Sequence, residues 1–491
     1  MTHRTAHTPL QQRQAGILLH PTSLPGPWHC GDLGSEAWHF VDFLAAAGQH
    51  VWQILPLGPT HDDMSPYQSL SAHAGNPQLI SIEALQAQGW LDGGVIPDPR
   101  PEAKAPLIAR AWHGFNARAD DGARAELQQF IDASHWLEDY ALFRIIKQVE
   151  QGRGWNEWPA PLRDREPAAL ARLRESHADE LAAIRFEQFI FEQQWQALKR
   201  HANGKGITIF GDMPIFVAHD SADVWAQRQC FDLDESGRPT VVAGVPPDYF
   251  SATGQRWGNP HYDWEWMEAD GFSWWRQRLE GQLRLFDLVR IDHFRGFEAY
   301  WEVPVHEETA INGRWVKAPG DALFATLLEL FDPLPVVAED LGTITPEVTE
   351  LRTKYALPGM RILHFAFDGS PDNPYLPHNH DVNSVVYTGT HDNDTTLGWY
   401  DSLPESVCQN MNEYLGQPGE AMPWPLIRAA YASVARLAIV PLQDVLELGA
   451  EHRMNTPGTV VGNWQWRFRW EQVTPDRAPR LLRLTELYRR R

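Results

Sequence analysis

The chain of 491 residues contains only three cysteines, Cys30, Cys230 and Cys408, and they stand far apart. This spacing excludes a disulfide framework and matches no cysteine pattern that binds a metal. We therefore expect no metal site, and we expect the protein to work in the reducing cytoplasm.

Positive charge and long apolar runs are also scarce. Lys and Arg number 42 against 64 Asp and Glu, so the formal net charge is −22. This balance argues against nucleic acid or an anionic membrane as a partner, because both bind basic surfaces. No apolar run reaches 18 residues, which argues against a membrane span, and residues 1–14 lack the apolar centre of a signal peptide.

Tryptophan, by contrast, is abundant: there are 22 tryptophans, together with 21 histidines. Either the indole rings fill the core and interfaces, or part of the excess lines a sugar cleft, since pyranose rings pack their C–H faces on aromatic rings. Composition leaves both readings open.

The most informative stretch is residues 286–292 (Phe-Asp-Leu-Val-Arg-Ile-Asp). Its apolar and β-branched residues predict a buried parallel strand. Alternation along the strand puts Arg290 and Asp292 on one face, one pleat apart, at its carboxyl end. Once paired, the guanidinium would keep the carboxylate ionised and able to act as a nucleophile. The alternative is an ordinary ion pair in which Asp292 caps the next helix.

Short strands of this kind alternate with helical patterns along the whole chain. The predicted strands cover residues 16–21, 51–56, 206–212, 286–292, 335–340, 360–367, 384–392 and 438–443. They predict a closed (β/α)8 TIM barrel, one catalytic unit that occupies residues 1–491. An open doubly wound sheet is the alternative, and the lack of a G-x-G-x-x-G turn after the first strand argues mildly against it. Ser35 is predicted to cap the first helix, and Gly48 to end it.

Two long insertions interrupt this alternation. Residues 82–200 show helical stripes and almost no strand pattern, which predicts a helical insertion after the second strand. Residues 213–272 follow the third strand, and their segment 245–259 is too polar and too rich in Gly and Pro for a strand. Its aromatic residues suit a substrate surface, whereas an Ω-loop packed on itself is the alternative. Tyr67, in the loop after the second strand, either binds substrate or packs within a turn.

Four of the predicted strands end in an acid: Asp212, Asp292, Glu339 and Asp392. In a barrel these carboxylates converge on the carboxyl-terminal rim, where they repel one another unless a cation, a metal or a proton neutralises them. Metal-assisted catalysis and glycoside chemistry both use such clusters, and the second needs one carboxylate nucleophile and one carboxylic acid. The aromatic insertions favour the sugar chemistry.

Three motifs resemble those of the amylomaltase family: residues 289–297 (Val-Arg-Ile-Asp-His-Phe-Arg-Gly-Phe), 337–342 (Val-Ala-Glu-Asp-Leu-Gly) and 390–395 (Thr-His-Asp-Asn-Asp-Thr). The members of this family, glycoside hydrolase family 77, are 4-α-glucanotransferases within the α-amylase-like superfamily of retaining enzymes. The resemblance extends from residues 20–26 to residues 462–464, and it includes residues 211–217 and 246–259. It implies a (β/α)8 barrel without a C-terminal β-sandwich, and no required cofactor.

The resemblance also implies roles for the matching residues. Asp292 would be the nucleophile, Glu339 the general acid/base and Asp392 the stabiliser of the transition state. The apolar neighbours Pro335 and Val337 should raise the pKa of Glu339, which must carry a proton at neutral pH. The sugar at the cleavage site would be lined by Asp212, Arg290, His293 and His391. The other implied substrate-binding residues are Tyr67, Tyr249, Phe250, Gln255, Trp257, Asn259 and Asn463.

The expected function is transfer of an α-1,4-glucan segment to the 4-hydroxyl of glucose or another glucan, by a retaining double displacement. The nearest alternative is a hydrolase on the same site, with water as the acceptor. A non-catalytic glucan-binding protein is the alternative from another class, but it would have no use for an intact acid triad. Maltooligosaccharides are the expected partners, and the chain is expected to be a monomer or a weak homodimer.

Overall fold

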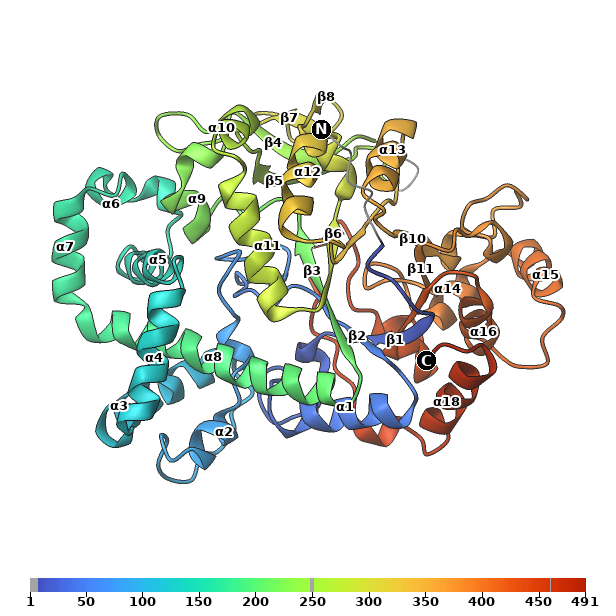
Figure 1. Cartoon of the computed structure of the whole chain (residues 1–491), viewed down its shortest axis with the longest axis horizontal. Helices are drawn as coiled ribbons and strands as arrows, with labels where there is room; N and C mark the ends of the chain where they lie inside the picture. Colours follow the sequence, from blue (N-terminus) through green and yellow to red (C-terminus); the bar gives the residue numbers. More distant parts are fainter. Residues whose placement is uncertain (1–7, 248–250, 460) are drawn as a thin grey trace.

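The computed structural model describes residues 8–247, 251–459 and 461–491 (Figure 1). Its central sheet consists of eight parallel strands: β1 (Gln14–Leu18), β2 (Val51–Gln53), β3 (Thr208–Pro214), β6 (Leu288–Asp292), β9 (Val336–Ala338), β10 (Gly359–Ile362), β11 (Ser384–Tyr387) and β12 (Leu437–Pro441). Strand β1 pairs with both β2 and β12. The backbone N–H of Ala338, in β9, donates to the carbonyl of Pro358, just before β10, at 2.8 Å. The predicted (β/α)8 barrel is confirmed.

The barrel strands are mostly apolar on both faces, as parallel strands covered by helices should be, and their polar residues include Asp212 of β3 and Arg290 and Asp292 of β6. Every residue of β9, β11 and β12 is buried. The barrel is surrounded by helices that include α1 (Ser35–Ala46), α11 (Ser273–Leu285), α12 (Gly320–Leu330), α16 (Trp424–Ala432) and α18 (Arg477–Leu487) (Figure 1).

The two ends of helix α1 test the predicted N-cap at Ser35 and the predicted end at Gly48. The cap predicted at Ser35 is wrong, because Gly34 holds the N-cap position and the Ser35 hydroxyl donates to Glu36 at 3.3 Å instead. Gly48 does follow the end of the helix with a φ of +66°. This left-handed conformation is one that glycine adopts readily, so the predicted end of α1 is confirmed.

Residues 82–204 are all described, and none of them forms a strand. Their helices are α2 (Ile82–Ala87), α3 (Lys104–Arg118), α4 (Asp121–Ala133), α5 (Leu137–Val149), α6 (Ala160–Arg163), α7 (Pro167–Ser176) and α8 (Ala178–Gly204). Helix α8 brings the chain back to the barrel, where the Trp195 indole N–H donates to the carbonyl of Leu285 at 2.9 Å. Helices α3 to α7 lie at one side of the molecule, in cyan at the left of Figure 1.

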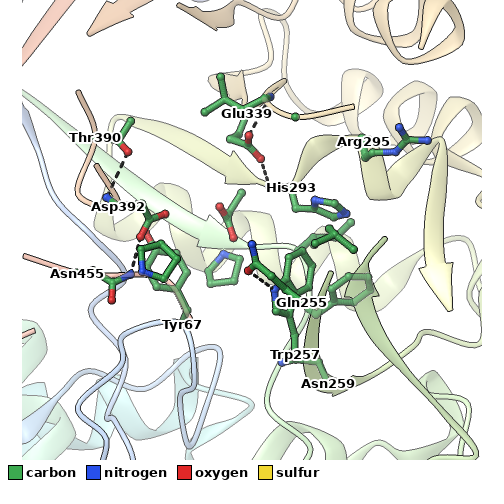
Figure 2. A pocket seen from close by; sticks show the side chains of 18 of the residues that line it. Tyr67, Gln255, Trp257, Asn259, His293, Arg295, Glu339, Thr390, Asp392 and Asn455 are labelled. Atoms are coloured by element: carbon green, nitrogen blue, oxygen red, sulfur yellow. Dashed lines mark hydrogen bonds between the residues drawn. The ribbon is translucent and has the colours of Figure 1, made fainter. Parts of the chain in front are cut away.

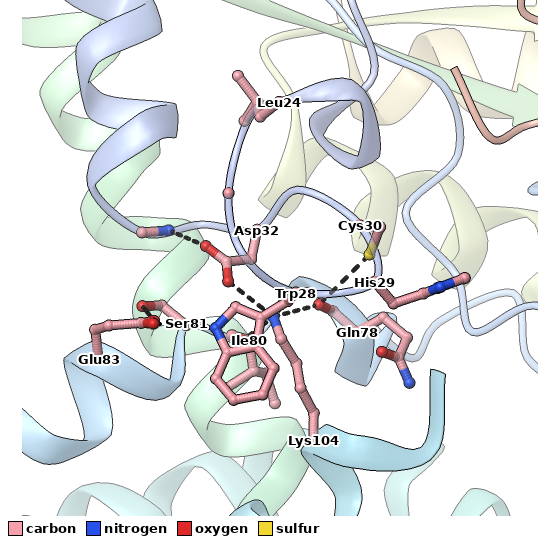
Figure 3. A network of polar contacts seen from close by, with 12 residues as sticks. Leu24, Trp28, His29, Cys30, Asp32, Gln78, Ile80, Ser81, Glu83 and Lys104 are labelled. Carbon is pink, nitrogen blue, oxygen red and sulfur yellow. Dashed lines mark hydrogen bonds and ion pairs between the residues drawn. The ribbon is translucent and has the colours of Figure 1, made fainter. Parts of the chain in front are cut away.

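A buried ion pair joins helix α3 to the loop between β1 and α1 (Figure 3). The Lys104 ammonium donates to the Asp32 carboxylate at 2.8 Å and to the carbonyls of Gln78 and Ile80 at 2.9 and 2.8 Å. Only 3% of the Lys104 side chain is exposed. Burying a charge is costly unless it is paired and its hydrogen-bonding groups are satisfied, and here all three ammonium protons have acceptors. The network therefore fastens the helical segment to the barrel.

A second sheet, which is antiparallel, departs from the prediction. Its strands pair in the order β5 (Gln255–Pro260), β4 (Val241–Val245), β7 (Ala299–Pro304) and β8 (Arg314–Lys317). The prediction that residues 245–259 form no strand is therefore wrong. Strand β5 is at the edge of the sheet, where only one side pairs, so its polar residues, glycine and proline are tolerated.

The described residues after β12 form helices, turns and loops, including α17 (Leu442–Val445) and α18, but no strand. The helices of the described residues were also compared with the requirements of a membrane span. None combines the length and the apolar composition that a crossing needs.

Candidate active site

An arginine links two acids across neighbouring strands at the centre of the site. The register of β3 and β6 places Asp212 directly opposite Arg290. The Arg290 guanidinium donates to Asp212 at 2.6 Å and to Asp292 at 2.7 Å. The pairing of Arg290 with Asp292 one pleat away is therefore confirmed. Only 5% of the Arg290 side chain is exposed, whereas 31% of the Asp292 side chain is exposed, because Asp292 faces a cavity.

This cavity has a volume of about 470 Å³ and lies between the carboxyl ends of the barrel strands and the antiparallel sheet. Figure 2 shows several of the side chains that line it. The predicted site residues on its wall are Tyr67, Gln255, Trp257, Asn259, Arg290, Asp292, His293, Glu339 and Asp392. Residues from five barrel strands or their following loops thus converge on one cavity, as is typical of the active end of such barrels.

Glu339 follows β9 directly and is held by backbone N–H groups. One carboxyl oxygen accepts from the N–H of His293 at 2.7 Å, and the other accepts from the N–H of Leu341 at 2.9 Å (Figure 2). His293 has a φ of +56°, a strained conformation for a residue with a side chain, and it brings this N–H to Glu339.

The two carboxyl groups Glu339 and Asp292 differ in their contacts with cations. Burial, with a smaller contribution from the charge of Asp292, raises the pKa of Glu339 to about 8 against the opposing charge of Arg290. Burial also raises the pKa of Asp292 above its usual value, but Asp292 contacts the Arg290 guanidinium directly, which favours its ionised form. At neutral pH Glu339 therefore carries a proton.

Asp392 lies beyond the end of its strand, which is shorter than predicted. Strand β11 ends at Tyr387, so Asp392 stands in the turn that follows. Its carboxylate accepts from the Asn455 amide at 2.6 Å and lies 3.3 Å from Nε2 of His391. Burial in the pocket alone would raise the pKa of Asp392, but His391 and Asn455 outweigh it and hold this pKa well below its usual range. Asp392 is therefore an ionised acceptor.

The turn that carries Asp392 is fastened at both ends by one buried carboxylate. Asp444, in α17, is 1% exposed. It accepts from the hydroxyls of Thr388 and Thr396, both at 2.6 Å, and from the backbone N–H of Thr396 at 2.7 Å. Because Thr388 and Thr396 flank residues 389–395, Asp444 fixes the position of the segment between them.

Asp212 and His391 are not among the residues that line this cavity, and their contact with the sugar stays a prediction. They lie behind Tyr67, whose hydroxyl donates to Asp212 at 2.7 Å and lies 2.8 Å from Nε2 of His391. The rings of Tyr67 and His391 stack with centroids 5.3 Å apart. Asp212 therefore orients Tyr67 and Arg290, and His391 orients Tyr67 and Asp392.

An uncharged part of the cavity wall is formed by Gln255, Trp257, Asn259 and His293. The Trp257 ring packs edge-on against His293 with centroids 4.8 Å apart, and its indole N–H donates to Gln255 at 3.2 Å. Asn259 anchors this wall through its amide, which donates to the carbonyl of Val217 at 2.9 Å. Burial lowers the pKa of His293 to about 3, so its ring is neutral.

Besides Asp212 and His391, three predicted residues are not placed at the cavity. Tyr249 and Phe250 lie outside the described residues. Asn463 does not line the cavity: its side chain accepts from the N–H of Thr456 at 2.9 Å and donates to Thr459, which closes the loop between them.

Asn455 is a site residue that the sequence analysis missed. A signal for it existed, since residues 453–458 (Arg-Met-Asn-Thr-Pro-Gly) form a polar loop beyond the carboxyl end of the last barrel strand. What the sequence did not reveal is that the Asn455 amide reaches Asp392, 63 residues earlier in the chain.

The described residues contain no group of three or more His, Cys, Asp or Glu side chains arranged to hold a metal ion. The site instead combines a protonated carboxyl group, a carboxylate paired with arginine and a second ionised carboxylate, all facing one cavity. Such a set can protonate a leaving oxygen, attack an electrophilic carbon and accept hydrogen bonds from hydroxyl groups.

Comparison with known proteins gives a consistent result. A family model described as 4-alpha-glucanotransferase matches residues 19–473. The 4-alpha-glucanotransferase of Thermus thermophilus is 52% identical over 491 aligned residues, which cover 96% of this chain and 98% of that protein. The enzyme of the same name from Synechocystis sp. is 50% identical, with coverages of 98% and 99%.

A solved structure shows the same likeness over the whole fold. The amylomaltase from Streptococcus agalactiae in complex with acarbose has a TM-score of 0.94 and 38% sequence identity to this chain. The match covers 98% of this chain and 100% of that one.

Proposed function

This chain belongs to the 4-α-glucanotransferase family, and we propose that it transfers segments of α-1,4-glucans by double displacement, with Asp292 as the nucleophile and Glu339 as the acid and base. One observation supports this proposal above all others. Asp292 is paired with Arg290 at 2.7 Å, while Glu339, facing the same cavity, has a pKa raised to about 8. A retaining mechanism needs this combination of an ionised and a protonated carboxyl group.

In the first half of the reaction, Glu339 gives its proton to the glycosidic oxygen while a carboxylate oxygen of Asp292 bonds to the anomeric carbon. The bond between this carbon and the glycosidic oxygen breaks, and the leaving fragment departs with the proton on its new 4-hydroxyl. The donor fragment stays bound to Asp292 as an ester.

In the second half, the ionised Glu339 removes the proton from the 4-hydroxyl of an acceptor glucan. The acceptor oxygen bonds to the anomeric carbon, and the carboxylate of Asp292 leaves. Glu339 ends protonated again, as it began, so the cycle consumes no proton and no energy source.

Asp392 would accept hydrogen bonds from two hydroxyls of the reacting sugar. These bonds strengthen as the ring flattens towards the transition state. The contacts with Asn455 and His391 suit this role, because they fix the carboxylate in its ionised form. Tyr67 and Trp257 would supply the aromatic surfaces on which glucose rings pack.

The proposed substrates are maltooligosaccharides and longer α-1,4-glucans, as donors and as acceptors. The likeness to an amylomaltase whose solved structure contains acarbose supports a cavity for such sugars. We also propose that residues 1–491 act as one catalytic barrel in the cytoplasm, where the free thiols of Cys30, Cys230 and Cys408 would stay reduced. The chain would be a monomer or a weak homodimer.

The reaction with maltotriose alone tests the proposal. A transferase converts it into free glucose and a ladder of longer oligomers, which chromatography resolves. Glucose and maltose as the only products would show a hydrolase, and unchanged maltotriose would show a binding protein. The Asp292→Asn variant, which is a poor nucleophile, is the matched control and should produce no ladder.

A further inference from the structure

Two residues on the cavity wall have no part in the chemistry described above. Arg295 lies in the turn after β6, and Trp315 lies on β8 at the far edge of the antiparallel sheet. Both line the same cavity as Asp292 and Glu339. The Trp315 side chain is one of the exposed large apolar residues, with 38% of the residue accessible, whereas Arg295 is 6% accessible.

The Trp315 ring is held in place from two directions. The Arg295 guanidinium lies over it, 3.7 Å from the ring centroid, and Trp301 packs edge-on against it at 5.1 Å. Arg295 is itself anchored, because it donates to the carbonyl of Thr343. A cation this close to the face of an indole is attracted by the ring, so the ring is a rigid surface.

The position of these residues relative to the acids indicates which end of the glucan they face. Figure 2 shows Asp392, Asn455 and Tyr67 together on one side, with His293 and Arg295 on the other and Glu339 between the two groups. Glu339 must contact the bond that breaks, and Asp392 must contact the sugar that becomes attached to Asp292. Arg295 and Trp315 therefore lie on the side of the leaving and incoming glucans.

We propose that Trp315, clamped by Arg295, is the platform for the second glucose unit of the acceptor, so that the enzyme discriminates acceptors of two or more α-1,4-linked units from free glucose. This inference rests on the proposed transferase function. The C–H face of a pyranose packs on an indole ring, and a ring that is already fixed loses little conformational entropy when it binds. Trp257 packs against His293, whose backbone N–H donates to Glu339, and this position suits the first acceptor unit.

The test compares acceptors of different length in the Trp315→Ala variant. An α-maltosyl fluoride donor is held at a fixed concentration, and labelled glucose, maltose or maltotriose is varied. The KM for labelled maltose and maltotriose should rise about 10-fold, the effect of losing one stacked ring, while the KM for glucose stays within about 2-fold. The rate of donor consumption at saturating glucose should not change.

Equal changes for all three acceptors, or no change for any of them, would overturn this inference. If the parent enzyme transfers nothing to any acceptor, the proposed function has failed instead, so the two failures are distinguishable. Trp315→Phe keeps a ring under Arg295 and should recover most of the preference for maltose, even if the alanine variant folds poorly. The matched control is Trp266→Ala, which removes an exposed tryptophan of α10 (Trp264–Ala269) that does not line the cavity. This variant should leave the KM values for glucose, maltose and maltotriose unchanged.

Discussion

At the scale of single residues, the site depends on two carboxyl groups that face the same cavity but have different hydrogen-bond partners. Glu339 accepts only backbone N–H groups in the hydrogen bonds described, whereas Asp292 contacts a guanidinium. The rise in the pKa of Glu339 that its apolar neighbours predicted is confirmed in direction, and burial is its largest cause. The two side chains have similar pKa values in water, so their surroundings in the protein decide which of them carries a proton.

The pH dependence of kcat/KM should report these two groups. Glu339 must be protonated in the free enzyme, so activity should fall as the pH rises through about 8, the value to which its pKa is raised. Asp292 must be ionised, and its pKa is also raised, so the fall on the acid side should occur above the usual range of an aspartate. A profile from pH 4 to 10 measures both limbs. An alkaline limb that persists unchanged in Glu339→Gln would assign it to another group.

Some of these residues could be predicted from the sequence, and others could not. Arg290 and Asp292 are two positions apart on one strand, so strand geometry alone brings them together. Asp392 and Asn455 come from different loops, and their contact depends on how those loops fold, which no local pattern encodes. The same holds for Tyr67, whose hydroxyl reaches Asp212 and His391 across the barrel.

At the scale of elements, the loop after β11 shows how a catalytic side chain is positioned without a strand beneath it. The predicted strand ran on to residue 392, because Thr388 and Thr390 continue the alternation of the strand. The actual strand ends at Tyr387, and the Thr388 hydroxyl donates to Asp444. Buried side-chain hydrogen bonds from Asp444 in α17 thus hold this turn in place of the backbone hydrogen bonds between paired strands.

Removal of one of these bonds should affect the rate more than substrate binding. Thr388→Val keeps the shape of the side chain but deprives Asp444 of a donor, so Asp392 should lose its position and kcat should fall about 10-fold, since hydrogen bonds to a charged group contribute about 1.5 to 3 kcal/mol. KM should change little, because the contacts of Asp392 strengthen in the transition state. The measurement is steady-state kinetics at a temperature well below unfolding.

Thr388→Ser is the matched control, because it retains the hydroxyl and should keep most of kcat. A valine variant that loses thermal stability but keeps kcat would show that the contact between Thr388 and Asp444 serves folding alone.

At the scale of the whole molecule, the barrel was predictable and the antiparallel sheet was not. The barrel strands are mostly apolar and alternate with helices, which is a strong signal. Strand β5 contains Gln, Arg, Gly, Asn and Pro, and it pairs only because β4 offers it an edge. Pairing between segments far apart in the chain, such as β4 with β7, leaves little local trace in the sequence.

The helical segment is fastened to the barrel by the buried pair of Lys104 and Asp32. Lys104→Met should lower the free energy of unfolding by about 3 kcal/mol, because it leaves Asp32 buried without its cation. The double variant Lys104→Met with Asp32→Asn should lose less free energy of unfolding than Lys104→Met alone. Urea denaturation measures both variants, and kcat below the unfolding transition should stay unchanged.

Lys354→Met, which breaks an exposed pair with Asp321, is the matched control and should cost less than about 1 kcal/mol. If Lys104→Met loses no more free energy of unfolding than Lys354→Met, the buried network does not stabilise the fold.

The covalent intermediate tests the central claim most directly. Glu339→Gln should still react with an α-glucosyl fluoride, whose leaving group needs little acid, but it cannot activate the acceptor in the second half. Mass spectrometry of the digested variant should find one added glycosyl unit on the peptide that contains Asp292, and Asp292→Asn should show none. An adduct on Asp212 or Asp392, or full activity in either variant, would contradict the assignment of nucleophile and acid/base.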